Sequence, residues 1–206
     1  MIFAHFKKGF CIIHMNEISR DIRYRQTEED LRDAFELLCL KKDPQKITVA
    51  EMAERTGVTR STFYNHYTDM PTLITKIEDE ILDEIFSMLD RCREEGMDDR
   101  KLVRSFFSAL CRYIRKSGYL IRTLSRLSSV RFIEQALLRL REYVLLDMSH
   151  MEGSPARQQR AAYMMAGSIG GVVGILHKWT LENCEDSPES VAKLLTVVLT
   201  ADFLKI

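Results

Sequence analysis

Polar side chains are concentrated in one short stretch, residues 59–66, which has the sequence Thr-Arg-Ser-Thr-Phe-Tyr-Asn-His. Its hydroxyls, amide, imidazole and single guanidinium can pair with base edges and phosphate oxygens, and the stretch contains no carboxylate. At helical spacing, Phe63 faces inward together with Val58, and most of the polar side chains face outward. The sequence therefore predicts a short helix whose outer face suits the major groove of DNA.

The preceding residues supply the elements that would position this helix. Thr48 can cap a helix from Val49 to about Thr56, and Gly57 suits the left-handed residue that ends a helix. A second helix then begins at Thr59 or Arg60 and ends at about Tyr67. This spacing is typical of a helix-turn-helix, and the alternative is an ordinary pair of antiparallel helices with a polar surface.

The segment TVAEMAERTGVTRSTFYNHYTDMPTLI resembles the DNA-binding domain of the TetR family of transcriptional regulators. The resemblance covers roughly Glu28 to Ile81 and combines the turn spacing with an aromatic run and a following Leu-rich helix. The residues that carry it are Phe63, Tyr64, Asn65, His66 and Tyr67, followed by Asp69 and Leu73. Met70 departs from the pattern, since many members have a phosphate-contacting Lys at the start of this next helix.

Within this interpretation, we assign Arg60 and Asn65 to base contacts, because both side chains can form bidentate hydrogen bonds. The remaining polar residues are expected to position the DNA backbone, with Tyr67 partly in the core; they are Thr48, Thr59, Ser61, Thr62, Tyr64, His66 and Tyr67.

Apolar periodicity predicts an all-α protein of about nine helices, with no alternating run that would indicate a strand. The expected ranges are 28–40, 49–56, 60–67, 70–93, 100–115, 119–130, 131–151, 156–182 and 187–203, with a turn at 95–99 and a loop at 153–155. They define a helix-turn-helix domain at 25–69 and an effector-binding and dimerisation domain at 70–206. Residues 1–24 are expected to form a flexible arm or leader, with Met15 as an alternative start; the other interpretation is a basic arm that follows the DNA backbone.

The overall composition gives no electrostatic signal for nucleic acid, because Lys plus Arg and Asp plus Glu are 30 each among 206 residues. Residues 91–141, however, contain thirteen Lys and Arg against five Asp and Glu. A solvated basic surface explains this surplus, and the alternative is a site for an anionic effector or a protein partner. The five cysteines form no CxxC pair and indicate a reducing cytoplasm. No apolar run is long enough to span a membrane.

Two further surfaces are expected in the larger domain. One is an effector pocket, for which core packing is the alternative; its residues are Phe86, Phe106, Phe107, Leu110, Tyr113, Tyr119, Met164 and Met165. The other is a dimer interface, since glycines allow helices to approach closely, either within a subunit or between two subunits. Its residues are Gly167, Gly170, Gly171, Gly174, Leu194 and Val198, and the resemblance implies that the last two helices form it.

The histidines lie far apart and no catalytic or metal-binding motif is present, so we expect neither an enzyme, a cofactor nor a metal site. The resemblance implies a homodimeric, cytoplasmic one-component regulator, a repressor, that binds a near-palindromic operator in double-stranded DNA. A small-molecule effector in the larger domain would then change the spacing of the two recognition helices. The alternative is an interaction protein of the same fold that acts through a protein partner and binds DNA weakly.

Overall fold

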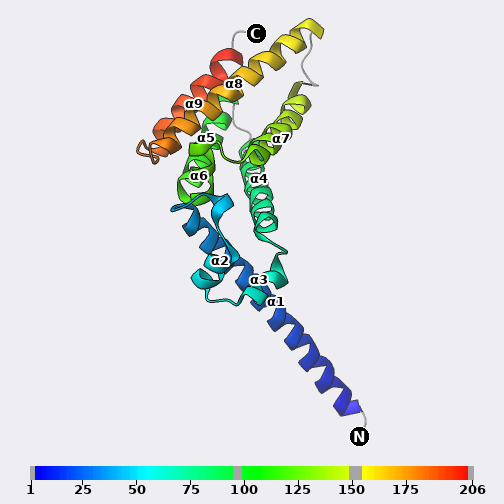
Figure 1. The fold of residues 1–206 in the computed structure, drawn as a ribbon. Coiled ribbons are helices and arrows are strands. Elements are labelled where there is room, and N and C mark those ends of the chain that lie inside the picture. The colour runs from blue at the N-terminus through cyan, green and yellow to red at the C-terminus, as the bar shows by residue number, and fades with distance from the viewer. Residues whose placement is uncertain (1–2, 95–98, 149–154, 204–206) are drawn as a thin grey trace. The chain divides into compact units, whose positions relative to one another are not determined.

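The computed structural model describes residues 3–94, 99–148 and 155–203 (Figure 1). Within these ranges the chain forms nine α-helices, one 3-10 helix and no strand, which confirms the predicted all-α fold. The elements are α1 (Phe3–Cys39), η1 (Pro44–Lys46), α2 (Val49–Thr56), α3 (Arg60–His66), α4 (Met70–Glu94), α5 (Asp99–Lys116), α6 (Gly118–Arg126), α7 (Val130–Met148), α8 (Pro155–Leu181) and α9 (Pro188–Phe203). They form two compact units, Met1–Leu73 and Ile74–Ile206.

The first helix differs from the prediction, because α1 begins at Phe3 and includes most of the segment expected to be a flexible arm. This segment contains no proline, and Gly9 is its one glycine, so nothing in it breaks a helix. Its apolar residues lack a helical period, which is why periodicity placed the start near Glu28. Of the turn expected at 95–99 and the loop expected at 153–155, residues 95–98 and 153–154 lie outside the described residues, whereas Asp99 and Pro155 begin α5 and α8.

The first unit has a small core formed by α1, η1, α2 and α3. Helix α1 packs against η1 and α2, and α2 packs against α3. Leu31 and Phe35 of α1, Met52 of α2 and Phe63 of α3 are each 0% exposed. Because α2 and α3 have only eight and seven residues, their stability depends on this shared core.

In the second unit, α8 and α9 form a helical hairpin, with α5 packed against α9 and α6 against α8 (Figure 1). The Trp179 indole donates a 3.0 Å hydrogen bond to the backbone oxygen of Asp186, which fixes the connection between α8 and α9. Ile114, Leu120 and Leu195 lie in the core of this unit. No helix in the described ranges is apolar over a length that would cross a bilayer.

A buried carboxylate joins α4 to α6 and α7 within the second unit. Glu78 of α4 is 2% exposed and accepts hydrogen bonds from the hydroxyls of Tyr119 and Ser129, the latter at 2.6 Å. Arg131 bridges Glu78 and Asp79, with N–O distances of 2.5 and 2.8 Å. Burial and the hydrogen bond to Glu78 raise the pKa of Tyr119 above its ordinary value, so the phenol stays protonated and acts as a donor.

Candidate nucleic-acid interface

A capping box fixes the start of α2. The Thr48 hydroxyl accepts from the Glu51 backbone N–H at 3.3 Å, and the Thr48 N–H donates to the Glu51 carboxylate at 2.9 Å. Lys42 donates to the same carboxylate at 2.8 Å. The Thr48 hydroxyl also donates to this carboxylate, at 2.8 Å. Lys42, the Thr48 hydroxyl and the Thr48 N–H, in that order, lower the pKa of Glu51 to about 2. The predicted DNA-contacting residue Thr48 therefore uses its exposed hydroxyl to hold α2, and the Lys42 charge is partly neutralised.

Gly57 and Thr59 form the turn between α2 and α3. Gly57 has a φ of +74° and its N–H donates to the Ala53 oxygen at 2.9 Å, which is the helix-ending geometry expected from the sequence. Thr59 caps α3 by accepting from the Thr62 N–H at 3.0 Å, and the two hydroxyls lie 2.8 Å apart. The hydroxyls of Thr59 and Thr62 thus orient the helix.

Four side chains on α3 combine exposure with unused hydrogen-bonding capacity. Arg60, Ser61, Tyr64 and Asn65 are all exposed, Tyr64 by 56%. None of them has a side-chain hydrogen bond or ion pair with the residues that the structure describes. Among the predicted site residues of α3, these are the ones that remain available to a ligand.

His66 and Tyr67 lie on the opposite side of α3, against α1. The His66 side chain is 4% exposed and its ring stacks on Tyr24, with ring centroids 3.9 Å apart. The Tyr67 hydroxyl donates to the Glu28 carboxylate at 3.5 Å, and Tyr67 is 5% exposed. His66 was expected on the outer face, but helical spacing alone could not reveal that Tyr24 of α1 covers its ring. Both residues therefore support α3 from within the unit.

The start of α4 is also capped. The Asp69 carboxylate accepts from the backbone N–H and the hydroxyl of Thr72, at 2.8 and 2.7 Å. These bonds lower the pKa of Asp69, so it stays charged at neutral pH. One helix-start amide is thus already paired, and Met70 supplies no positive charge.

The residues predicted for an effector pocket divide into two groups. Phe107, Leu110 and Tyr119 are buried in the core of the second unit, whereas the rest are half-buried, namely Phe86, Phe106, Tyr113, Met164 and Met165. A cavity of about 410 Å³ lies between α5 and α9, and none of the eight residues lines it. An effector pocket formed by these residues stays a prediction.

The residues predicted for a dimer interface also fall into two groups. A Cβ atom added to Gly171 would lie 2.8 Å from Val198 Cγ1 of α9, whereas one added to Gly167, Gly170 or Gly174 would meet nothing within 4 Å. Gly171 thus serves close packing between α8 and α9 of one subunit. The other three glycines face open space, and Leu194 is 57% exposed. Of the two roles that the sequence left open, packing within a subunit applies to Gly171, and a role of the other three glycines in a dimer stays a prediction.

No family model and no curated protein matches this sequence. Solved structures do. A TetR-like regulator from Rhodococcus sp. RHA1 superposes with a TM-score of 0.65 at 13% identity, covering 87% of this chain and 97% of that chain. A TetR/AcrR-family regulator from Aquifex aeolicus VF5 gives 0.60 at 20% identity, covering 85% and 98%. The regulator FadR from Bacillus subtilis, in complex with stearoyl-CoA, gives 0.60 at 13% identity, covering 86% and 98%. The chain therefore has the fold of the TetR family of transcriptional regulators.

Proposed function

We propose that this protein is a transcriptional regulator that binds double-stranded DNA through α3 and acts as a repressor. The exposed, unpartnered polar face of α3 carries the proposal, because Arg60, Ser61, Tyr64 and Asn65 offer donors and acceptors suited to base edges and phosphates. The fold, whose solved neighbours are transcriptional regulators, supports it. Arg60 and Asn65 would contact bases, and Ser61 and Tyr64 would contact the backbone.

A homodimer is the second part of the proposal. A near-palindromic operator needs two recognition helices about 34–36 Å apart, one for each half-site. The outer face of α8 and α9 suits such pairing, because it combines three open glycines with exposed apolar side chains. The most exposed of these side chains are Tyr163 at 71%, Leu181 at 60% and Leu194 at 57%. Burying this face against a second copy would remove apolar surface from water.

A small-molecule effector in the second unit would control DNA binding. The neighbour FadR is described in complex with stearoyl-CoA, which supports a ligand-binding role for a protein of this fold. Helix α4 begins in the first unit and continues through 25 residues into the second. After Pro71 in its first turn it contains no proline or glycine, so it can transmit a displacement without bending. A change of a few ångströms in the spacing of the two recognition helices would weaken operator binding.

An alternative function is that of an interaction protein with weak DNA binding. The limited positive charge favours it, since Arg60 is the one Lys or Arg of α3, Lys42 pairs with Glu51 and Met70 is uncharged.

Binding of the purified protein to DNA from upstream of its coding region, measured by fluorescence anisotropy with random duplex as competitor, separates the two functions. A regulator should bind the specific duplex about 10³-fold or more tightly than random DNA, and its affinity should fall steeply with salt. Equal affinity for the two duplexes would require selection of sites from genomic DNA. If that selection also yielded no preferred sequence, the interaction protein would be the better description.

Arg60→Ala and Tyr64→Phe should have different effects on DNA binding. Loss of a bidentate base contact should weaken the specific site by about 1–3 kcal/mol and relax selectivity at one base pair. Loss of the Tyr64 hydroxyl should weaken specific and random duplexes by the same small factor. Anisotropy titrations on a panel of single-base variants would measure both. An equal loss on all duplexes for Arg60→Ala would show that Arg60 contacts phosphate.

Gly170→Ala and Gly171→Ala form a matched pair for the dimer. In a lone subunit, Gly170→Ala should stabilise α8 by about 0.5–1 kcal/mol, because nothing opposes the new methyl group. Gly171→Ala should destabilise the fold by about 1 kcal/mol, since its methyl group would overlap Val198. If a second copy covers this face, Gly170→Ala should instead raise the dimer dissociation constant. Analytical ultracentrifugation and urea unfolding would measure the two effects, and unchanged dimerisation would remove Gly170 from the interface.

A further inference from the structure

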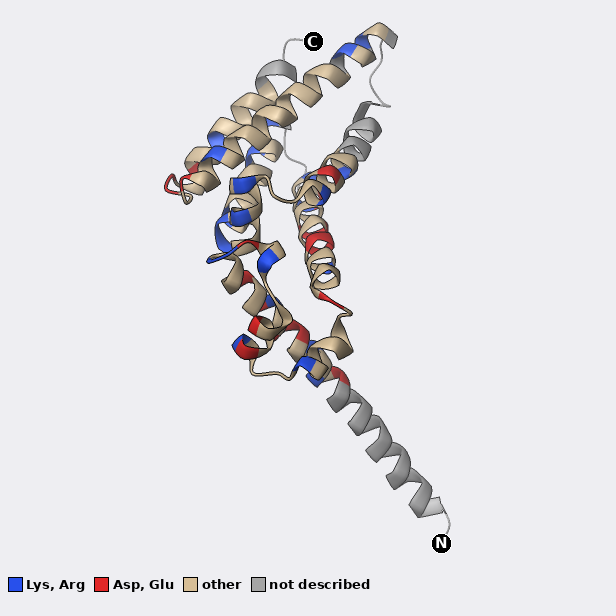
Figure 2. Ribbon diagram, in the orientation of Figure 1, with Lys and Arg blue, Asp and Glu red and all other residues tan. Residues whose placement is uncertain are grey.

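The cavity between α5 and α9 is lined by basic side chains that come from two helices distant in sequence. Arg100, Lys101 and Arg104 lie in the first turns of α5, and Lys193, Thr196 and Val197 lie on α9. Its volume of about 410 Å³ is in the range of small-molecule sites. Among the residues that the structure describes, no carboxylate lines it. The strong Lys and Arg content of α5 is visible along the ribbon (Figure 2).

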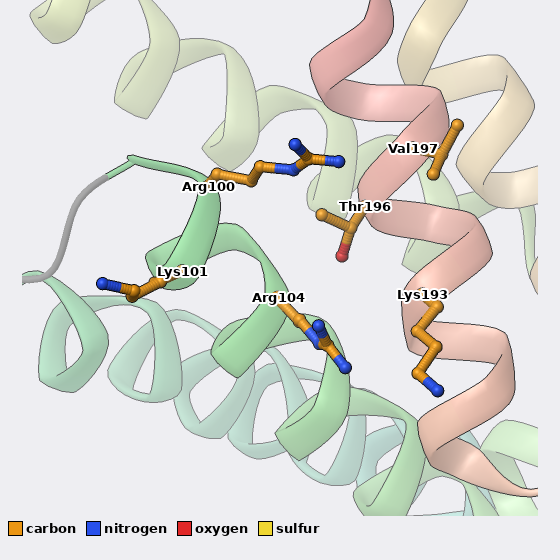
Figure 3. A pocket seen from close by; sticks show the side chains of 6 residues that line it. All are labelled: Arg100, Lys101, Arg104, Lys193, Thr196 and Val197. Carbon is orange, nitrogen blue, oxygen red and sulfur yellow. The ribbon is translucent and has the colours of Figure 1, made fainter.

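Three of the four cationic side chains lie around the cavity between the two helices. Arg100 and Arg104 extend from α5 toward α9 on either side of Thr196, and Lys193 extends from α9 on the side of Arg104 (Figure 3). Lys101 points away from the cavity. Thr196 is 4% exposed and donates its hydroxyl proton to the Ala192 backbone oxygen at 2.7 Å, so its oxygen can still accept a hydrogen bond from a ligand.

Arg100, Arg104 and Lys193 have no counter-charge among the residues that the structure describes, since none of them takes part in an ion pair or a side-chain hydrogen bond there. Other arginines of the same unit do have such partners. Arg131 pairs with Glu78 and Asp79, and Arg139 pairs with Asp83 at 2.5 Å. The cavity thus gathers three positive charges that lack the carboxylate partners of Arg131 and Arg139.

Such an arrangement favours an anion. Arg100 and Arg104 are four residues apart on one helix, where like charges repel each other, and Lys193 adds a third positive charge from another helix. A bound anion would relieve this repulsion. Guanidinium groups form paired hydrogen bonds with phosphate and carboxylate oxygens, and an ammonium adds a further donor.

We propose that the cavity between α5 and α9 binds a small multivalent anion, held through its phosphate or carboxylate groups by Arg100, Arg104 and Lys193. Two or more negative charges match the three cations. The site lies entirely in the second unit, so the proposal does not depend on DNA binding by α3.

Isothermal titration calorimetry on the full chain, without DNA and at constant ionic strength, tests the proposal. Pyrophosphate probes the phosphate class and citrate probes the carboxylate class. We expect saturable binding of at least one of them, weakened about tenfold or more by Arg100→Gln and by Arg104→Gln. Arg104→Lys, which keeps the charge, should lose less affinity for the anion than Arg104→Gln. Thermal unfolding of each variant confirms that it is folded.

Arg115→Gln is the matched control, because it removes the same charge from the other end of α5. Its affinity for the anion should equal that of the wild type. Binding of pyrophosphate alone or citrate alone supports the site and identifies the class of ligand. The proposal would be overturned if neither anion bound at 10 mM, about the weakest affinity expected of three charged contacts. It would also be overturned if Arg115→Gln lost as much affinity as Arg100→Gln and Arg104→Gln. If an acidic side chain of a second copy filled the cavity, neither anion would bind, and the proposal would be overturned in the same way.

Discussion

Phe63→Ala is expected to unfold the first unit and to abolish DNA binding while the second unit remains folded. Phe63 is 0% exposed and is the buried residue of the seven-residue helix α3. Removing a buried phenyl ring costs about 3–5 kcal/mol. A helix of this length has little stability of its own, and the small core that holds it cannot absorb such a loss.

Limited proteolysis followed by mass spectrometry would measure this effect, with new cleavage sites expected between residues 47 and 67. The matched control is Tyr64→Ala, a substitution at the neighbouring residue, because Tyr64 is 56% exposed. That variant should lose DNA affinity but keep the protease resistance of the wild type. If Phe63→Ala were as resistant to protease as the wild type, the first unit would not depend on this core contact.

Glu78→Ala is expected to lower the free energy of unfolding of the second unit by about 3 kcal/mol. The substitution removes the acceptor of the Tyr119 and Ser129 hydroxyls, which are themselves buried. Each hydroxyl would then lose its hydrogen bond to Glu78 in a buried place. The lost contact with Arg131 should account for less of this decrease, because the Arg131 side chain is 41% exposed and retains Asp79 as a partner.

Two milder variants make this prediction specific. Glu78→Gln keeps an acceptor oxygen and nearly the same volume but loses the charge that faces Arg131, so its effect should be intermediate. Tyr119→Phe removes one donor and leaves Glu78 with Ser129 and Arg131, which should cost about 1 kcal/mol. Urea unfolding followed by circular dichroism would rank the three. A Glu78→Ala protein within 1 kcal/mol of wild type, roughly the net value of one hydrogen bond, would mean that water replaces the lost carboxylate.

The sequence was sufficient to predict the fold because its signals are local. Gly57, the capping residue Thr48, and the apolar period of the longer helices each act within a few residues of their own position. The start of α1 was missed for the same reason. Its first part has a helical backbone without an amphipathic pattern, and no local signal distinguishes such a segment from a flexible arm.

The candidate sites were only partly predictable, since their chemistry depends on contacts between distant segments. Arg60 and Asn65 are exposed as expected, but His66 is covered by Tyr24 of α1. Lys193 lies about ninety residues from Arg100 and Arg104 in the sequence, yet it lines the same cavity. The glycines of α8 follow one pattern, although only Gly171 meets a side chain of α9. Helical spacing gives the direction of a side chain but not what lies opposite it.

If two copies pair through α8 as proposed above, its outward glycines also affect how long a copy of this protein lasts in the cell. A subunit that has not yet paired would carry Gly167, Gly170 and Gly174 without any contact to offset their cost, about 0.5–1 kcal/mol each relative to alanine. Its α8 would open locally more often than the same helix in a pair. Proteases in the cell degrade chains that open in this way, so unpaired copies would be removed first. The amount of active regulator would then be limited by pairing as well as by synthesis.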